Sequence, residues 1–166
     1  MILAFAHPAI VVTDLERARE FYERMFGFRV IGHEGWEPGS PSEKVTGAAG
    51  SSCRGYYLAG HNCFLELFEF DQPAQTSAPP GQLMPHEPGI RHLAFYVDDV
   101  RAEYERLLAL GGEVLGELPE GDSVPMAIYC RDPFGNIIEL CRVPNDAEQP
   151  TSLPGVDKLG DYTGRD

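Results

Sequence analysis

The sequence predicts an α+β fold made of two βαβββ modules within one domain. Two observations predict this fold. A segment of the chain recurs at a second position, and each copy alternates apolar runs typical of strands with a stretch that has helical periodicity. The length agrees, because 166 residues can form one well-packed core but are too few for two large independent domains.

The first parts of the two modules align at an offset of 85 residues. Residues 7–15 (HPAIVVTDL) match residues 92–100 (HLAFYVDDV). Each copy predicts an apolar strand, then an aspartate that can cap a helix, then an amphipathic helix. A glycine at the same offset, Gly27 or Gly112, ends each helix.

The last strands of the two modules align at a shorter offset of 73 residues. Residues 64–67 (FLEL) match residues 137–140 (IIEL), so the first module is about 12 residues longer than the second. The surplus falls in Gly35–Gly50, which is rich in Gly, Pro and Ser and has no apolar period. We expect this segment to form an extended loop between two strands.

The remaining strands follow from short β-rich runs bounded by turn residues. They are expected at Phe28–His33, Ser52–Ala59 and Asn62–Phe70 in the first module, and at Glu113–Gly116, Pro125–Arg131 and Asn136–Val143 in the second. Asp132–Gly135 predicts a hairpin turn whose simple register pairs Cys130 with Ile137. The domain is expected to span residues 1–145, with module one at 1–70, a proline-rich linker at 71–88, module two at 89–145, and a mobile C-terminal tail at 146–166.

Composition and charge restrict the class of partner. The formal net charge of −13 repels phosphate backbones and anionic lipids, which argues against nucleic-acid and membrane partners and leaves small molecules. No run reaches the roughly 18 apolar residues that a membrane span requires. The four cysteines show no CxxC spacing, which favours reduced thiols and a cytoplasmic location.

Four side chains occupy equivalent places in the repeat: His7 with His92, and Glu66 with Glu139. If the modules pack about a pseudo-twofold axis, two imidazoles and two carboxylates converge. Singly, such residues are more often a satisfied core histidine and a solvent-facing glutamate. Here each carboxylate lies within an apolar run, where an unpaired charge is costly. A divalent metal neutralises it, and mixed N/O ligation suits Ni, Co, Zn, Mn or Fe(II).

Strand parity predicts which other side chains share the face of these four ligands. Glu69 has the opposite parity to Glu66 and no counterpart in the repeat, so we expect it on the other face. The candidate substrate-binding residues on the ligand face are Phe5, Phe64, Phe68 and Tyr96. The alternative is that these aromatic side chains only fill a core around a buried metal.

These residues resemble the vicinal oxygen chelate superfamily, which includes glyoxalase I, extradiol dioxygenases, and the bleomycin and fosfomycin resistance proteins. The resemblance rests on His7-x6-Asp-Leu, on His92, on residues 132–136 (DPFGN) and on residues 138–140 (IEL), and it covers roughly residues 4–143. It implies paired modules that form a curved mixed sheet around a metal cleft, with helices on the outside, usually in a homodimer.

The resemblance also implies a function. His7, Glu66, His92 and Glu139 match the four ligand positions of glyoxalase-type members, which implies a metal-dependent lyase or isomerase that stabilises an enolate-like intermediate. Glu139 is favoured as the catalytic base, with Glu66 as the alternative. Val11 and Phe70 replace an arginine and an asparagine that glyoxalase I uses on glutathione, which counts against a glutathione thioester substrate.

Two other functions remain open from the sequence. The first is an extradiol ring-cleaving dioxygenase with Fe(II), although such enzymes use two histidines and one carboxylate, and Glu66 would occupy an open position. The second is a non-catalytic drug-binding resistance protein, although those members lack the four ligands.

Overall fold

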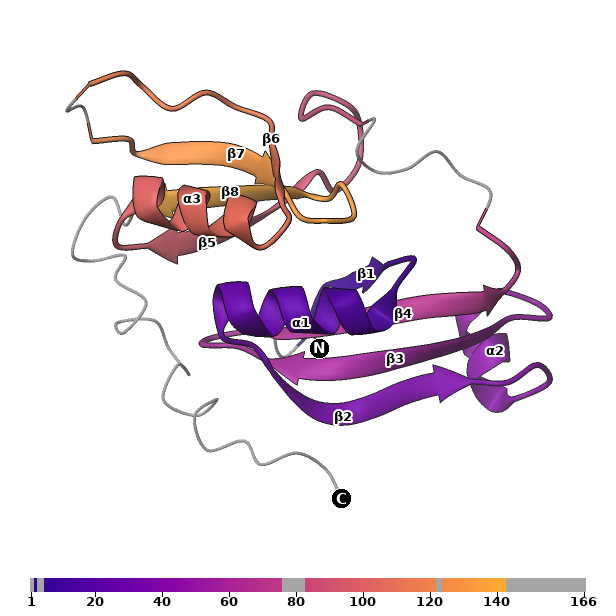
Figure 1. Ribbon diagram of the computed structural model, residues 1–166. Helices are drawn as coiled ribbons and strands as arrows, with labels where there is room; N and C mark the ends of the chain where they lie inside the picture. Colours follow the sequence, from indigo (N-terminus) through magenta and orange to yellow (C-terminus); the bar gives the residue numbers. More distant parts are fainter. Residues whose placement is uncertain (1, 3–4, 76–82, 122–123, 143–166) are drawn as a thin grey trace. The chain divides into compact units, whose positions relative to one another are not determined.

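The computed structural model describes residues 2, 5–75, 83–121 and 124–142, which form two mixed four-stranded sheets (Figure 1). The described residues divide into two compact units, one up to Gln75 and one from Leu83. The predicted C-terminal tail, 146–166, lies outside the described residues.

The first unit contains four strands and two helices among its described residues. They are β1 (Ala9–Val11), α1 (Leu15–Phe26), β2 (Arg29–Trp36), α2 (Pro41–Thr46), β3 (Ser52–Ala59) and β4 (Phe64–Gln72). The strand order is β1-β4-β3-β2, in which β1 runs parallel to β4 and the other neighbours are antiparallel. β4 extends two residues into the predicted linker.

The second unit repeats this arrangement. Its elements are β5 (His92–Val97), α3 (Val100–Ala109), β6 (Glu113–Val114), β7 (Ala127–Arg131) and β8 (Ile137–Arg142). The order β5-β8-β7-β6, with only β5 and β8 parallel, matches the first sheet strand for strand. The predicted α+β fold with two βαβββ modules is therefore confirmed.

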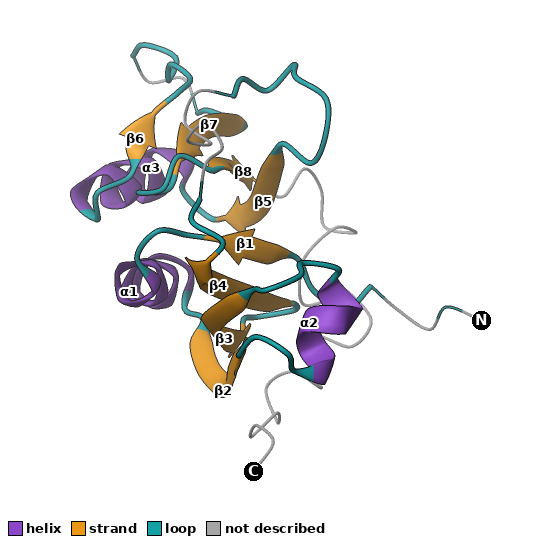
Figure 2. Ribbon diagram, turned by 90° about the vertical axis from the view of Figure 1, so that its right-hand side faces the viewer, coloured by secondary structure: helices purple, strands orange, loops and turns teal. Residues whose placement is uncertain are grey.

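Each long helix packs against one face of its own sheet (Figure 2). Asp14 caps α1 by accepting a hydrogen bond from the N–H of Arg17, and Gly27 ends the helix in the left-handed conformation at φ 68°. Apolar residues recur every three or four positions along α1, so they form one buried stripe. That stripe is Leu15, Ala18, Phe21, Tyr22, Met25 and Phe26, and the buried sheet residues of the same unit include Ile10, Leu58, Leu65 and Leu67.

The prediction of an extended loop at Gly35–Gly50 is wrong. β2 continues to Trp36, and residues 41–46 form the short helix α2. The sequence carries the signals for this helix, because Ser40 accepts a hydrogen bond from the N–H of Glu43 and Pro41 occupies the first turn. The Glu43 carboxylate in turn accepts hydrogen bonds from the N–H groups of Gly39 and Gly50. These bonds connect the helix to the residues before and after it.

The predicted register of the last hairpin is wrong by one residue. Cys130 pairs with Ile138, not with Ile137. Asp132 still belongs to the ladder, because its N–H donates to the carbonyl of Asn136 at 2.9 Å. The loop therefore has three residues ending in Gly135 at φ 90°, a known hairpin type that a two-residue register does not anticipate.

The first strand is shorter than the sequence suggests. His7 lies two residues before β1, whereas its counterpart His92 begins β5. Pro8 explains the difference, because proline has no N–H to donate to a ladder. Its carbonyl still accepts a hydrogen bond from the N–H of Glu66 at 3.1 Å, which holds this segment beside β4.

Within the described part of the chain, no helix is both long enough and apolar enough to cross a membrane.

Candidate functional site

The first unit brings His7 and Glu66 together. β1 and β4 run parallel with Ala9 opposite Glu66, so the segment that precedes β1 passes beside the carboxylate. His7 Nε2 lies 3.0 Å from Glu66 Oε2, and the two side chains are 30% and 19% exposed. An imidazole nitrogen and a carboxylate oxygen are thus held together on a face that solvent reaches.

The second unit brings His92 and Glu139 together in the same way. Ala94 lies opposite Glu139 in the parallel pairing of β5 and β8. His92 Nε2 lies 3.1 Å from Glu139 Oε2, and the side chains are 37% and 21% exposed. Each glutamate therefore pairs with the residue two positions after its histidine, as the repeat requires.

The chemistry of each pair fits part of a metal site. Each supplies one nitrogen and one carboxylate donor, and both types bind divalent transition metals. A pair alone is short of the four ligands typical of zinc and related ions. Within the residues that the structure describes, no group of three or more His, Cys, Asp or Glu side chains gathers to hold a metal ion. The two pairs belong to separate units, and each unit holds two donors.

A tyrosine that the sequence analysis missed accompanies each pair. In the antiparallel ladders, Tyr57 lies opposite Glu66 and Tyr129 lies opposite Glu139. The Tyr57 ring meets the His7 ring edge to face at 5.3 Å, with the Tyr57 hydroxyl 3.4 Å from His7 Nδ1. The repeat thus duplicates three side chains in each unit. Only the strand register, which the sequence does not fix, identifies these two tyrosines as the residues opposite the glutamates.

The second tyrosine also lies against its histidine and glutamate. The Tyr129 ring lies 5.1 Å from the His92 ring, and the ladder places Tyr129 opposite Glu139. Burial, followed by the negative charge of Glu139, raises the pKa of Tyr129 above its ordinary value. Tyr129 therefore stays a neutral donor around pH 7.

Aromatic side chains continue the ligand face of the first sheet. Phe64 stacks on Tyr57 with ring centroids 5.3 Å apart, and Phe68 meets Trp36 at 5.6 Å. Both are half-buried. Phe5 lies ahead of β1 and is 83% exposed, while Tyr96, on the ligand face of the second sheet, is 43% exposed. The first unit thus places Phe64 and Phe68 on the same face of β4 as Glu66.

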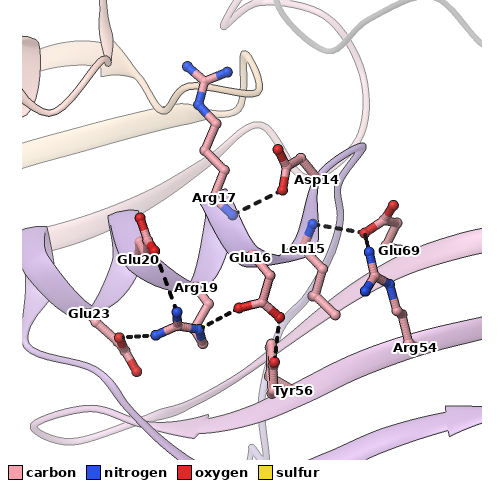
Figure 3. A network of polar contacts seen from close by, with 10 residues as sticks. All are labelled: Asp14, Leu15, Glu16, Arg17, Arg19, Glu20, Glu23, Arg54, Tyr56 and Glu69. Atoms are coloured by element: carbon pink, nitrogen blue, oxygen red, sulfur yellow. Dashed lines mark hydrogen bonds and ion pairs between the residues drawn. The ribbon is translucent and has the colours of Figure 1, made fainter.

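Glu69 lies on the other face of its sheet, as the sequence predicted. Its Oε2 accepts a 2.9 Å hydrogen bond from the backbone N–H of Leu15, at the start of α1, and a second of 2.9 Å from Arg54 (Figure 3). A carboxylate at a helix N-terminus is stabilised by the helix dipole. Glu69 therefore has a structural role and is not a rival of Glu66.

Arg131 is a cation on the ligand face of the second sheet that the sequence analysis did not identify. It pairs with Ile137 and is 4% exposed. Its guanidinium donates to the carbonyl of Gly135 at 2.7 Å and to that of Leu83 at 2.8 Å. These bonds use the cation to hold two loops.

The described cysteines are all free thiols. Cys130 is fully buried and donates to the carbonyl of Ile138 at 3.4 Å, and burial raises its pKa to about 12. A thiol with that pKa is protonated at neutral pH and is a poor nucleophile.

Comparison with known protein families gives one match over most of the chain. Residues 4–140 match the model of the Glyoxalase/Bleomycin resistance protein/Dioxygenase superfamily. An uncharacterised Bacillus subtilis (strain 168) protein, YwkD, is 31% identical over 113 residues, which cover 68% of this chain and 76% of that protein.

Solved structures share the fold. A glyoxalase family protein from Bacillus cereus aligns with a TM-score of 0.75 and 23% identity over 86% of this chain and 95% of its own. Leishmania major trypanothione-dependent glyoxalase I aligns with a TM-score of 0.58 and 22% identity over 85% and 87% of the two chains. The Listeria monocytogenes fosfomycin resistance protein FosX, in a complex with Mn(II) and a dihydroxypropylphosphonic acid, also aligns. Its TM-score is 0.56, with 21% identity over 90% of this chain and 98% of its own.

Proposed function

Because the chain belongs to the Glyoxalase/Bleomycin resistance protein/Dioxygenase superfamily, we propose that it is a metal-dependent lyase or isomerase of the glyoxalase type that acts on a small organic substrate. The observation that carries the proposal is the His–Glu pair found in both units, with Nε2 to Oε2 distances of 3.0 and 3.1 Å. A protein that only binds a drug has no need of two such pairs.

The proposed metal ligands are His7, Glu66, His92 and Glu139. Two imidazoles and two carboxylates suit Ni, Co, Zn, Mn or Fe(II). The pairs remain partly exposed, which supports a ligand role, because an ion pair with only a structural role gains little when solvent can reach it.

A divalent cation at such a site supplies Lewis-acid charge beside a carbonyl or two neighbouring oxygens of the substrate, which acidifies the adjacent carbon. The chain itself supplies the base. We propose that Glu139 takes the proton on a carboxylate oxygen, with Glu66 as the alternative base.

The aromatic surface beside His7 and Glu66 supports a substrate with an apolar part. Phe64 and Phe68 lie on the same face as Glu66, at alternate positions along β4. The buried guanidinium of Arg131 is occupied by backbone carbonyls. This arrangement favours an uncharged oxygen-bearing substrate over a phosphonate of the kind bound by FosX.

The first experiment is metal analysis of protein purified without added metal, with and without a chelator. We expect one divalent ion per chain, lost in both the His7→Ala and the His92→Ala variants. Retention of metal in either variant would show that the pairs do not share an ion and would remove the four-ligand site.

The second experiment tests the base. Glu139→Gln keeps a side chain of the same shape, so it should retain the fold and some metal while it loses turnover of α-hydroxy or dicarbonyl test substrates. An active Glu139→Gln variant would remove Glu139 from this role. Oxygen uptake with catechols and Fe(II), or release of a fosfomycin hydrolysis product, would instead assign a different reaction of the superfamily.

A further inference from the structure

The His7 imidazole has a polar partner at each ring nitrogen. Nε2 faces Glu66 Oε2 at 3.0 Å, and Nδ1 faces the Tyr57 hydroxyl at 3.4 Å. A neutral imidazole carries a proton on only one nitrogen, so these partners decide which tautomer is stable. Without metal, the near carboxylate favours a proton on Nε2, which leaves Nδ1 as an acceptor.

A metal ligated through Nε2 would reverse this requirement, because the proton must then lie on Nδ1 and needs an acceptor. A phenol hydroxyl can both donate and accept a hydrogen bond, so it can partner Nδ1 in either state. A carbonyl, which only accepts, and an ammonium, which only donates, could each serve only one state.

The position of Tyr57 is fixed independently of this hydrogen bond. Its backbone lies opposite Glu66 in the ladder, and its ring stacks on Phe64 at 5.3 Å with an interplanar angle of 16°. The ring also meets His7 edge to face at 82°. The hydroxyl is therefore presented to the imidazole by packing that a phenylalanine would preserve.

We propose that Tyr57 is a positioning residue that holds the His7 ring with Nε2 toward the Glu66 carboxylate and partners Nδ1 in both tautomers. The expected effect of Tyr57 on metal binding rests on the proposed function. The observed arrangement of Tyr57, His7 and Glu66 does not depend on it. The role is proposed for the first unit, where the tyrosine hydroxyl lies 3.4 Å from an imidazole nitrogen; in the second unit the Tyr129 and His92 rings are in contact at 5.1 Å.

The neighbouring tyrosine provides a matched control. Tyr56 lies on the opposite face of β3, where its hydroxyl donates to Glu16 at 2.5 Å (Figure 3). Tyr56→Phe therefore removes the same atom, from the same strand, on the face away from His7. Any general cost of losing a tyrosine hydroxyl appears in both variants, whereas a cost specific to His7 appears only in Tyr57→Phe.

The experiment measures Mn(II) and Zn(II) affinity by calorimetry, and the His7 tautomer by long-range ¹H–¹⁵N NMR of metal-free and Zn(II)-loaded protein. We expect Tyr57→Phe to bind either metal about 10- to 100-fold more weakly, the range for loss of a ligand's hydrogen-bond partner. We also expect it to lose the exchange-protected Nδ1–H of the loaded wild type. Tyr56→Phe should match the wild type in both measurements.

Equal affinity and an unchanged His7 ring signal in Tyr57→Phe would overturn the positioning role. If the wild type binds neither metal, the proposed function fails, and the metal-free tautomer alone decides the role of Tyr57. A tautomer shift in Tyr57→Phe but not in Tyr56→Phe then supports the role, and no shift overturns it.

Discussion

Glu66 and Glu69 lie three residues apart on β4 and point to opposite faces of the same sheet. Glu66 meets the His7 imidazole at 3.0 Å, while Glu69 accepts a hydrogen bond from the first N–H of α1 at 2.9 Å. Strand alternation thus gives two carboxylates in one short segment different physical roles. Substituting Glu66 and Glu69 one at a time distinguishes the two roles.

Replacing Glu69 should reduce stability without affecting metal binding. Glu69→Gln removes the charge that accepts from Leu15 and Arg54, so we expect a loss of about 1 to 2 kcal/mol in the free energy of unfolding. Urea denaturation measures it. Glu20→Gln is the control, because Glu20 is 64% exposed and makes only a 3.6 Å contact with Arg19 (Figure 3). An equal loss in both variants would contradict the role of Glu69.

Metal removal should lower the melting temperature of the wild type but not of a variant without ligands. An ion at 100 times its Kd stabilises a protein by about 2.7 kcal/mol, which is about 5 to 10 °C for a chain of this size. We expect this difference between Mn(II)-loaded and chelated protein. This difference in melting temperature should vanish in the double variant that combines Glu66→Gln with His92→Ala. A chelator effect that persists in the double variant would place the ion elsewhere.

The Cys130 thiol should remain unreactive in the native protein and should make stability depend on alkaline pH. Its folded pKa, raised to about 12 by burial, lies above the unfolded value. The contribution of the protonated thiol to the free energy of unfolding is therefore complete below the unfolded pKa of about 8.5. It is lost as pH rises toward 12. Cys130→Ala should flatten this part of the stability profile between pH 8.5 and 11. Native labelling of Cys130 at the rate of unfolded protein would contradict its burial.

The repeat made much of this fold predictable. Aligning two copies located the strands that carry Glu66, His92 and Glu139 and the segment that carries His7, because equivalent positions in a duplicated module have equivalent surroundings. The close His–Glu contact within each unit follows from the parallel pairing of a module's first and last strands, which the repeat alone does not specify. Whether the two pairs share one ion remains a prediction that metal analysis tests.

The tyrosines could not be predicted because they depend on register. A hairpin that pairs Cys130 with Ile137 sends Tyr129 to the helix face, and a shift of one residue returns it to Glu139. For Tyr57, the sequence shows two adjacent tyrosines on β3, and only the ladder reveals which one faces the site. The register of this hairpin is decided by its turn residues. Turn residues are a weaker sequence signal than the periodic spacing of apolar residues.

Asp132 is the residue that sets this register, and its replacement should disturb the site from a distance. It is fully buried, and its carboxylate accepts hydrogen bonds of 2.9, 2.9 and 2.8 Å from the Phe134 N–H, the Asn136 N–H and the Asn136 side-chain amide. Asp132→Ala leaves these donors without their acceptor, so we expect a loss of about 2 to 4 kcal/mol. Asp132→Asn keeps one oxygen for the two backbone donors but turns an amide toward another amide, so it should lie between wild type and Asp132→Ala.

The readout of that prediction is local as well as global. Amide hydrogen exchange at Phe134 and Asn136 should accelerate in the order wild type, Asp132→Asn, Asp132→Ala, because a neutral amide oxygen is a weaker acceptor than a carboxylate and alanine offers none. Contacts between Tyr129 and Glu139, followed by NMR, should weaken in parallel if the turn holds the register that places them opposite each other. Ser40→Ala, which removes a cap from α2 in the other unit, should leave both signals unchanged. Intact Tyr129–Glu139 contacts in Asp132→Ala would show instead that strand packing alone fixes the pairing.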